Sequence, residues 1–162
     1  MIYYSEFASP LGTLLLAAGD RGLHGIYFEE HRHFKGKDGW RHDPGHACLQ
    51  QTVHQLEEFF AGSRVAFDVP LDLVGTPFQQ TVWQELLAIP YGSTISYAQH
   101  AQRIGKPTAA RAVGAAIGRN PVSIVVPCHR VVGTGGAPTG YAGGLERKRA
   151  LLTFEALSAG SR

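Results

Sequence analysis

The sequence predicts an α/β protein, more specifically of the α+β class, with two lobes that divide between residues 75 and 76. Three short β-branched and aromatic stretches separated by glycine-containing turns open the chain and predict a small antiparallel sheet. Later stretches carry apolar residues at helical spacing, and two of them are separated by a tight glycine turn. We expect an N-terminal lobe with a three-stranded sheet and one helix, and a mostly helical C-terminal lobe with a helix-turn-helix.

The N-terminal lobe, residues 1–75, begins with the sheet. The turn signals Ser9-Pro10-Leu11-Gly12 and Gly19-Asp20-Arg21-Gly22 divide three strands, expected at residues 2–7, 13–18 and 23–29. A polar segment rich in glycine and histidine follows and favours a loop. Apolar spacing then predicts a helix at residues 48–60, and alternation predicts an extended segment at residues 65–73.

The C-terminal lobe, residues 76–162, is expected to begin with a capped helix. Thr76 is a suitable N-cap with Pro77 at the first helical position, and the helix should run to Leu87 and bury that residue. Two short helices follow, one capped by Ser96 and one capped by Thr108, with Gly105-Lys106-Pro107 between them. Their spacing predicts the helix-turn-helix. A last helix is expected at residues 145–157, with Leu145 among its apolar anchors.

A β-branched run leads into one of the two cysteines of the chain. The stretch Ile124–Val132 reads Ile-Val-Val-Pro-Cys-His-Arg-Val-Val, which predicts a buried strand that ends at Pro127-Cys128-His129. The glycine-rich residues 133–144, with Tyr141 near their end, are expected to form a hairpin loop. A strand end of this kind could hold a thiol at the floor of a pocket, and a core cysteine is the plain structural alternative.

Charge is distributed unequally between the halves. Residues 1–75 hold six Lys/Arg against ten Asp/Glu, a balance of −4, and residues 76–162 hold nine against three, a balance of +6. Five basic residues and no acidic one lie between Leu86 and Leu145: Arg103, Lys106, Arg111, Arg119 and Arg130. A half of one sign favours a partner that carries phosphates, although a solvated basic face without a partner has the same composition.

Composition excludes several classes of protein. The chain is 44% hydrophobic and 17% charged, which is ordinary for a folded domain and unlike a disordered segment. It has no apolar run long enough to span a membrane, and residues 1–6 lack the pattern of a signal peptide. Two cysteines provide no disulfide framework, so free thiols in a reducing, cytoplasmic setting are expected.

The second helix of the helix-turn-helix consists almost entirely of alanine and glycine, with Arg111 as its long side chain. A helix that reads bases in the major groove by hydrogen bonds would carry more polar side chains. Small side chains instead allow the backbone to approach a phosphate or a shallow minor groove, and one arginine could enter the base stack. Tight helix–helix packing would explain the same residues without DNA.

The adjacent Cys128 and His129 suggest thiolate chemistry, in which a base takes the thiol proton and a third group orients that base. Glu155 is the preferred carboxylate because Glu85 and Glu146 occupy helix positions that look more exposed. Spacing alone does not select it. These residues by themselves fit a cysteine hydrolase equally well.

Taken together, the motifs of the C-terminal half resemble the O6-alkylguanine-DNA alkyltransferase family. The signature is Ile124–Val131, and further matches stand in the family's order: Ile89-Pro90-Tyr91-Gly92, Ser96-Tyr97, Ala110–Gly114, Asn120-Pro121 and Gly140-Tyr141-x-Gly143-Gly144-Leu145. The resemblance covers Phe78 to Glu155. The N-terminal lobe is consistent with the family's variable first lobe and specifies little.

This resemblance implies single-use repair of DNA that contains O6-alkylguanine, with Cys128 as the alkyl acceptor. His129 would take the thiol proton through a water, with Glu155 orienting its ring. Asn120 would brace the turn that leads to the cysteine, and Tyr97 would donate a proton to the departing guanine. The family activity is that of a methylated-DNA–protein-cysteine methyltransferase, with O4-alkylthymine as a second candidate substrate.

The resemblance also implies a base pocket and a DNA contact surface. Tyr141 and Lys148 would line and close the pocket, and the carbonyls of Cys128 and Val131 with the amide of Ala142 would read the guanine edge. Ala142 and Ser123 depart from residues common in the family, which affects the alkyl groups that fit. Contacts to double-stranded DNA would come from Thr108, Ala110, Arg111, Gly114 and Ala115.

Neither a cofactor nor a metal is implied. Some family members bind zinc in the first lobe, but the histidine-rich segment here does not match their ligand pattern and a solvated loop is expected. No membrane and no obligate protein partner are implied, and a monomer is expected. The alternatives are a cysteine hydrolase and a non-catalytic protein that only recognises the lesion. In such lesion-binding relatives the acceptor cysteine is replaced.

Overall fold

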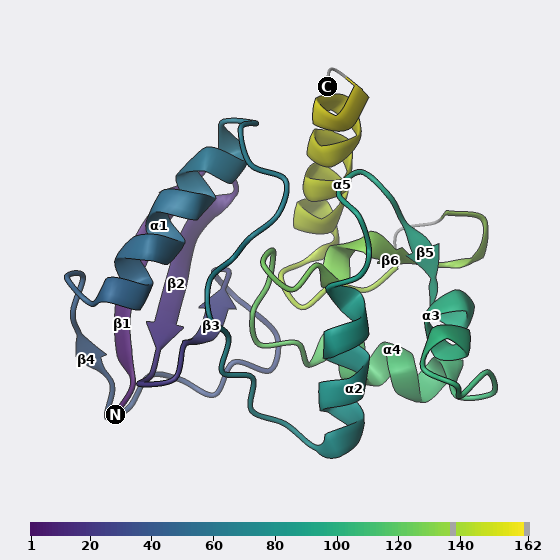
Figure 1. The fold of residues 1–162 in the computed structure, drawn as a ribbon, viewed down its shortest axis with the longest axis horizontal. Helices are drawn as coiled ribbons and strands as arrows, with labels where there is room; N and C mark the ends of the chain where they lie inside the picture. Colours follow the sequence, from purple (N-terminus) through teal and green to yellow (C-terminus); the bar gives the residue numbers. More distant parts are fainter. Residues whose placement is uncertain (137–138, 161–162) are drawn as a thin grey trace.

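The computed structural model describes residues 1–136 and 139–160, which form two adjoining lobes (Figure 1). The predicted antiparallel meander is confirmed as β1 (Tyr3–Ser9), β2 (Gly12–Ala18) and β3 (Leu23–Tyr27). A fourth strand, β4 (Arg41–His42), pairs parallel with β1, so the sheet order is β3-β2-β1-β4. The sequence analysis placed β4 in a loop, because two residues are too few to show alternation.

Helix α1 (Ala47–Phe60) covers one face of this sheet and buries Leu49, Leu56 and Phe59 (Figure 1). The extended segment expected at residues 65–73 passes beside β3 without becoming a regular strand. It makes one parallel bridge, between Leu71 and Leu23, and the carbonyl of Pro70 accepts a hydrogen bond from the amide of Leu23 at 2.7 Å. Pro70 itself has no amide to donate, which is consistent with irregular pairing here.

The C-terminal lobe begins with α2 (Pro77–Leu86), whose predicted cap is confirmed. Thr76 and Gln79 form a capping box, in which each side chain accepts a hydrogen bond from the other residue's amide at 3.0–3.1 Å. Leu87 ends the helix and is 43% exposed, so its predicted burial is wrong. The leucine follows the last turn and points away from the apolar face.

The helix-turn-helix consists of α3 (Tyr97–Arg103) and α4 (Ala110–Gly118) and is confirmed (Figure 1). Ser96 caps α3 as predicted. Thr108 does not cap α4: the amide of Ala109 bonds to the carbonyl of Lys106, and this turn moves the helix start one residue along the chain. Ala109 is therefore the N-cap, and no side chain caps this helix end.

The prediction of a strand that leads into Cys128 is wrong. Val122 makes an isolated bridge, residues 123–125 form a turn in which Ile124 has a φ of +73°, and a 3₁₀ turn, η1 (Cys128–Arg130), follows. Val131–Val132 then form β6, which pairs parallel with β5 (Ile95–Ser96). The run is apolar because it is buried on all sides, and periodicity cannot distinguish this from a buried strand.

The chain continues through a short turn, η2 (Thr134–Gly136), and ends in α5 (Leu145–Gly160). The predicted last helix is confirmed, although Leu145 is 36% exposed at its first turn and does not anchor it. The hairpin predicted for residues 133–144 includes residues 137 and 138, which lie outside the described residues. Among the helices described, none has the length and apolar character needed to cross a bilayer.

One apolar core extends through both lobes and fixes their contact. The amide of Ile26 in β3 donates to the carbonyl of Pro121 at 2.9 Å, and Ile26 forms a bridge with Val122. The N-terminal sheet therefore contacts the turn that leads to Cys128. The indole of Trp83 in α2 donates to the carbonyl of Ala116 in α4 at 2.8 Å, which fixes the helices on the other side of that turn.

Candidate functional site

Cys128 lies at the first position of η1 and is 5% exposed, at the wall of a cavity of about 340 Å³. This volume lies within the range of small-ligand pockets. Both lobes and the helix-turn-helix contribute to the lining, with residues Arg32, His33, Tyr97, Gly114, Ala115, Ile117, Gly118, Arg119, Gly140, Tyr141 and Ala142. The predicted placement of the thiol in a pocket therefore agrees with the structure.

Asn120 holds the turn that precedes the cysteine and is 2% exposed. Its amide nitrogen donates to the carbonyls of Val126 at 2.9 Å and Val122 at 3.4 Å, and its oxygen accepts from the amide of Val122 at 3.0 Å. These bonds replace the pairing that a strand would have provided. Burial raises the pKa of the Cys128 thiol, against the opposing effects of Asn120 and the charge of Lys148.

His129 lies next to the thiol in sequence and is fully buried. Its Nε2 is 2.8 Å from Oε2 of Glu155, while Nδ1 is buried without a hydrogen-bond partner among the described residues. Burial lowers the pKa of His129 although Glu155 opposes the shift. A carboxylate partner at Nε2 favours the tautomer with its proton there, which leaves the Nδ1 lone pair available to accept a proton.

Arg130 completes the site and was not recognised from the sequence as part of it. Its Nε and Nη2 donate to the two carboxylate oxygens of Glu155, each at 2.8 Å, and its Nη1 donates to the carbonyl of Ile89 at 2.8 Å. Burial alone would raise the pKa of Glu155, but the hydrogen bonds from His129 and Arg130 outweigh burial and lower it to about 2. The carboxylate is therefore ionised.

The sequence analysis counted Arg130 in a basic surface, and that assignment is wrong because the residue is 6% exposed. A buried carboxylate requires compensation, so the arginine beside His129 was the signal that could have identified it. The four other basic residues of that stretch are exposed: Arg103, Lys106, Arg111 and Arg119. The basic surface persists with one residue fewer.

Tyr97 lines the cavity, and the buried Lys148 contacts it without lining the cavity itself. The Tyr97 hydroxyl donates to the carbonyl of Thr139 at 2.9 Å, and Lys148 Nζ donates to that carbonyl at 2.7 Å, to the carbonyl of Gly140 at 3.1 Å and to the Tyr97 oxygen at 3.4 Å. Desolvation lowers the pKa of Lys148 to about 8, although the nearby thiol opposes this. Burial raises the pKa of the Tyr97 hydroxyl although its hydrogen bond to Thr139 opposes the shift, and a donor to its oxygen would stabilise the phenolate that forms on proton donation.

The remaining pocket residues fall into two groups. Tyr141 and Ala142 line the cavity, and burial raises the pKa of the Tyr141 hydroxyl well above its usual value. Ser123 and Val131 are buried behind the wall, and the cavity lining does not include their side chains. Neither residue is therefore among those that line the cavity.

The residues expected to meet DNA lie along α4 and the turn before it. Thr108, Arg111 and Ala115 are exposed, whereas Ala110 and Gly114 are half-buried. A Cβ atom on Gly114 would lie 3.6 Å from the Tyr97 ring, so this helix passes close to the cavity as well. The exposed face of α4 is thus small and carries one long cation.

The histidine-rich segment of the first lobe is mostly an exposed loop, as expected, but His31, Phe34 and Trp40 are half-buried in an aromatic cluster. His31 Nδ1 accepts a hydrogen bond from the amide of Phe28 at 3.2 Å, and Tyr27 packs against His31, Phe34 and Trp40. Among residues 1–136 and 139–160, no group of three or more His, Cys, Asp or Glu side chains is arranged to hold a metal ion.

Comparison with family models gives two matches that together cover most of the chain. Residues 77–157 match the model described as "6-O-methylguanine DNA methyltransferase, DNA binding domain". Residues 2–73 match the model described as "6-O-methylguanine DNA methyltransferase, ribonuclease-like domain".

Curated relatives and solved structures agree with these matches. A methylated-DNA–protein-cysteine methyltransferase of Mycobacterium tuberculosis is 50% identical over 155 residues, which is 96% of this chain and 93% of the relative. One of Methanosarcina acetivorans is 45% identical over 160 residues, 95% and 98% of the two chains. The crystal structure of M. tuberculosis OGT in complex with DNA superposes with a TM-score of 0.89 at 49% identity, covering 96% of this chain and 94% of that one.

The substitution Arg130→Met tests whether the buried ion pair stabilises the site. Removing the arginine leaves the Glu155 carboxylate buried with one partner fewer, so we expect unfolding free energy to fall by about 3–5 kcal/mol in urea titrations at pH 7. Arg103→Met is the control. Arg103 is an exposed arginine at the end of α3, so its replacement should change the free energy of unfolding by less than about 0.5 kcal/mol.

The same variant has a distinct pH dependence. In the wild type the depressed pKa of Glu155 gives stability that is complete above its unfolded value and is lost as pH falls towards about 2. Without Arg130 the folded pKa should be higher, so this loss should begin at a higher pH. Equal stability of Arg130→Met and wild type at pH 7 would contradict the role assigned to the pair.

Proposed function

Since the chain belongs to the 6-O-methylguanine DNA methyltransferase family, we propose that it repairs O6-alkylguanine in DNA by transferring the alkyl group to its own Cys128. The activity is that of a methylated-DNA–protein-cysteine methyltransferase. The observation that carries the proposal is the buried thiol beside the His129–Glu155 pair at the wall of a cavity that adjoins the helix-turn-helix. This observation supports transfer of the alkyl group to the thiol from a base that has left the DNA duplex.

The proposed chemistry moves one alkyl group to the sulfur and, as the net result of two transfers, one proton to the guanine. The neutral His129 ring, through a bridging water, takes the proton of Cys128, and Glu155 stabilises the resulting imidazolium. The sulfur then attacks the alkyl carbon as the carbon–O6 bond breaks. A proton from the Tyr97 hydroxyl neutralises the departing guanine, and the contact from Lys148 supports that transfer. The His129 imidazolium then gives its proton to water and the Tyr97 phenolate takes one from water, so that both residues end neutral.

The product is a thioether. Unlike a thioester, it has no carbonyl carbon that water can attack, so the alkyl group stays on the sulfur. The protein is therefore consumed, with one alkyl group per molecule. A cysteine hydrolase would require turnover and an activated water, and the family membership makes that alternative unnecessary. The retained Cys128 likewise separates this chain from members that only bind the lesion.

The lesion base must leave the duplex before a thiol with 5% exposure can reach it. We propose that α4 approaches the minor groove through its small side chains, Ala110, Gly114 and Ala115, with Thr108 beside the backbone. Arg111 would then occupy the place of the rotated base. The exposed position of Arg111 at the start of α4 supports this assignment.

Base recognition is assigned to the cavity lining and the backbone behind it. Tyr141 and Lys148 would close over the ring, and the carbonyls of Cys128 and Val131 with the amide of Ala142 would contact the guanine edge. The buried Ser123 would support the wall behind Tyr141. In this proposal the N-terminal domain, residues 1–75, shapes the pocket. The C-terminal domain, residues 76–162, binds DNA and accepts the alkyl group.

Two further assignments follow from the proposed chemistry. Cys48 and Cys128 are both free thiols, and an acceptor thiol must stay reduced, so we assign the protein to the cytoplasm. The partner is double-stranded DNA that carries the lesion, and the proposed chemistry needs neither a cofactor nor a second protein chain.

A mass measurement tests the function. Incubation with a duplex containing O6-methylguanine should add one methyl group to each protein molecule, on the peptide that contains Cys128. The Cys128→Ser variant should gain none, and Cys48→Ser should react like the wild type. An unmodified wild-type protein with the lesion still in the duplex would contradict the proposal.

Replacing Arg111 tests its proposed place in the base stack. Arg111→Ala should slow repair in a duplex by about tenfold or more, since each 1.4 kcal/mol of lost transition-state binding gives a factor of ten. Reaction with the free base O6-benzylguanine, which has no stack to open, should be unchanged. The measurement compares the two second-order rates, and equal slowing of both would exclude the assigned role.

A further inference from the structure

We propose that Arg147 and Phe28 make the N-terminal lobe part of the base pocket, with Arg147 acting as a positioning residue for the wall formed by residues 140–144. The inference rests on the function proposed above. This segment places Tyr141 and Ala142 in the lining of the cavity that contains Cys128. What holds the segment therefore determines the shape of the space into which a base must fit.

The wall segment cannot hold itself in place. It is bounded by Gly140 and Gly144, whose φ angles of +54° and +97° lie in the region that glycine adopts without strain. Its internal hydrogen bond joins the amide of Gly144 to the carbonyl of Tyr141 at 2.9 Å, which closes the turn but does not set its distance from the thiol. Lys148 holds the first end, through the carbonyl of Gly140. The second end needs contacts from elsewhere.

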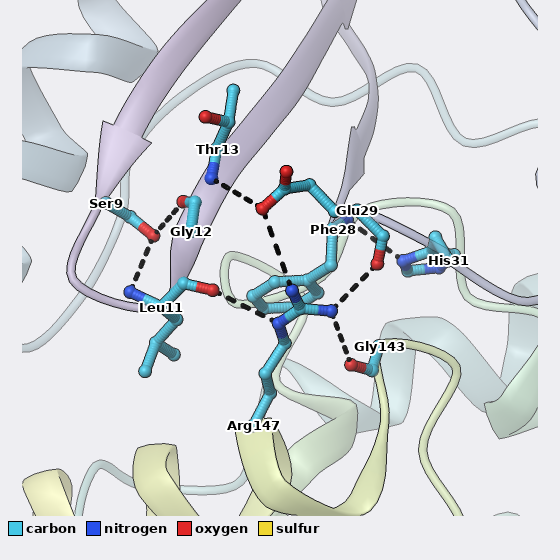
Figure 2. Close-up of polar contacts among 9 residues, drawn as sticks. All are labelled: Ser9, Leu11, Gly12, Thr13, Phe28, Glu29, His31, Gly143 and Arg147. Atoms are coloured by element: carbon cyan, nitrogen blue, oxygen red, sulfur yellow. Dashed lines mark hydrogen bonds and ion pairs between the residues drawn. The ribbon is translucent and has the colours of Figure 1, made fainter.

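Arg147 supplies one of these contacts and ties it to the sheet, as Figure 2 shows. Its Nη1 donates to the carbonyls of Gly143 at 3.1 Å and Glu29 at 2.8 Å, and its Nε donates to the carbonyl of Leu11 at 3.1 Å. The Glu29 carboxylate lies 3.9 Å from Nη2. One planar guanidinium thus joins the wall, the end of β3 and the β1–β2 turn, which a fork of five donors allows.

Phe28 is the platform on which the wall lies. The guanidinium carbon of Arg147 is 5.1 Å from the ring centre, and the Tyr141 ring contacts it edge-on at 5.9 Å between centroids. A Cβ atom on Gly143 would lie 2.3 Å from the ring, so the backbone there rests directly on it. Phe28 is 3% exposed and belongs to the core, which makes it a rigid support.

A third contact comes from the same lobe. The amide of Arg32 donates to the carbonyl of Ala142 at 2.8 Å, and Arg32 and His33 themselves reach the cavity lining. The wall is therefore held at Ala142 by a backbone bond, at Gly143 by Arg147 and below by Phe28. All three supports depend on the N-terminal sheet or the loop after it.

The thiol and its base are held differently. Cys128 and His129 are fixed by Asn120, Glu155 and Arg130, and the hydrogen bonds of Arg147 described above reach none of these residues. Loosening the wall should therefore weaken binding of the base while leaving transfer from a bound base nearly unchanged. A general loss of structure would lower both.

The test measures benzyl transfer from the free base O6-benzylguanine to Cys128 over a range of base concentrations. Arg147→Gln should raise the half-saturating concentration by about tenfold and change the limiting rate by less than about threefold. Phe28→Leu should act in the same direction. Arg147→Lys should restore only part of the binding, because one ammonium cannot reproduce the planar fork. Arg149→Gln, on the exposed side of the same helix, is the matched control and should react like the wild type.

Melting curves of each variant establish that the assay temperature lies in the folded range. If Arg147→Gln is unfolded at the assay temperature, the half-saturating concentration and limiting rate of Phe28→Leu and Arg147→Lys are compared with those of the wild type instead. Wild-type protein that gains no benzyl group would refute the proposed function itself. Wild-type protein that reacts, with Arg147→Gln unchanged in half-saturation or slowed only in its limiting rate, would overturn the positioning role of Arg147.

Discussion

The site depends on the hydrogen bonds made by the buried carboxylate of Glu155, a residue of α5. It accepts hydrogen bonds from His129 and from two nitrogens of Arg130, so the last helix holds the turn that carries the thiol. A buried charge of this kind is tolerated only with good geometry and full pairing, which three bonds of 2.8 Å provide. The same carboxylate fixes the histidine tautomer, so its structural and chemical roles cannot be separated.

Burial of the thiol places a requirement on the rest of the molecule. A base can reach Cys128 only after leaving its stack, so the chain needs a surface that opens DNA and a pocket that receives the base. The helix-turn-helix adjoins the cavity through Gly114 and Ala115. The first lobe supports the wall of residues 140–144 through Phe28 and through the carbonyls of Leu11 and Glu29, which Arg147 of α5 binds. The apolar core shared by both lobes fixes the position of these two walls relative to each other.

The sequence predicted those parts of the fold that local signals specify. The meander, the capping residues Thr76 and Ser96 and the helix-turn-helix follow from turn chemistry and apolar spacing. The turn before Cys128 could not be predicted, because a run buried on all sides is indistinguishable from a strand, and its conformation depends on the Asn120 side chain. Likewise, Glu155 was selected by resemblance, while Arg130 and Arg147 act through contacts between residues far apart in the chain.

The state of the His129 ring tests the account most directly. Nitrogen-15 NMR of labelled protein, with the ring signals assigned by their loss in His129→Asn, reports which nitrogens carry protons at pH 7. The account predicts a neutral ring with the proton on Nε2, toward Glu155, and an unprotonated Nδ1 available to the Cys128 proton. A ring protonated at both nitrogens in the unreacted protein would contradict it, since no nitrogen lone pair would then be free to accept the thiol proton.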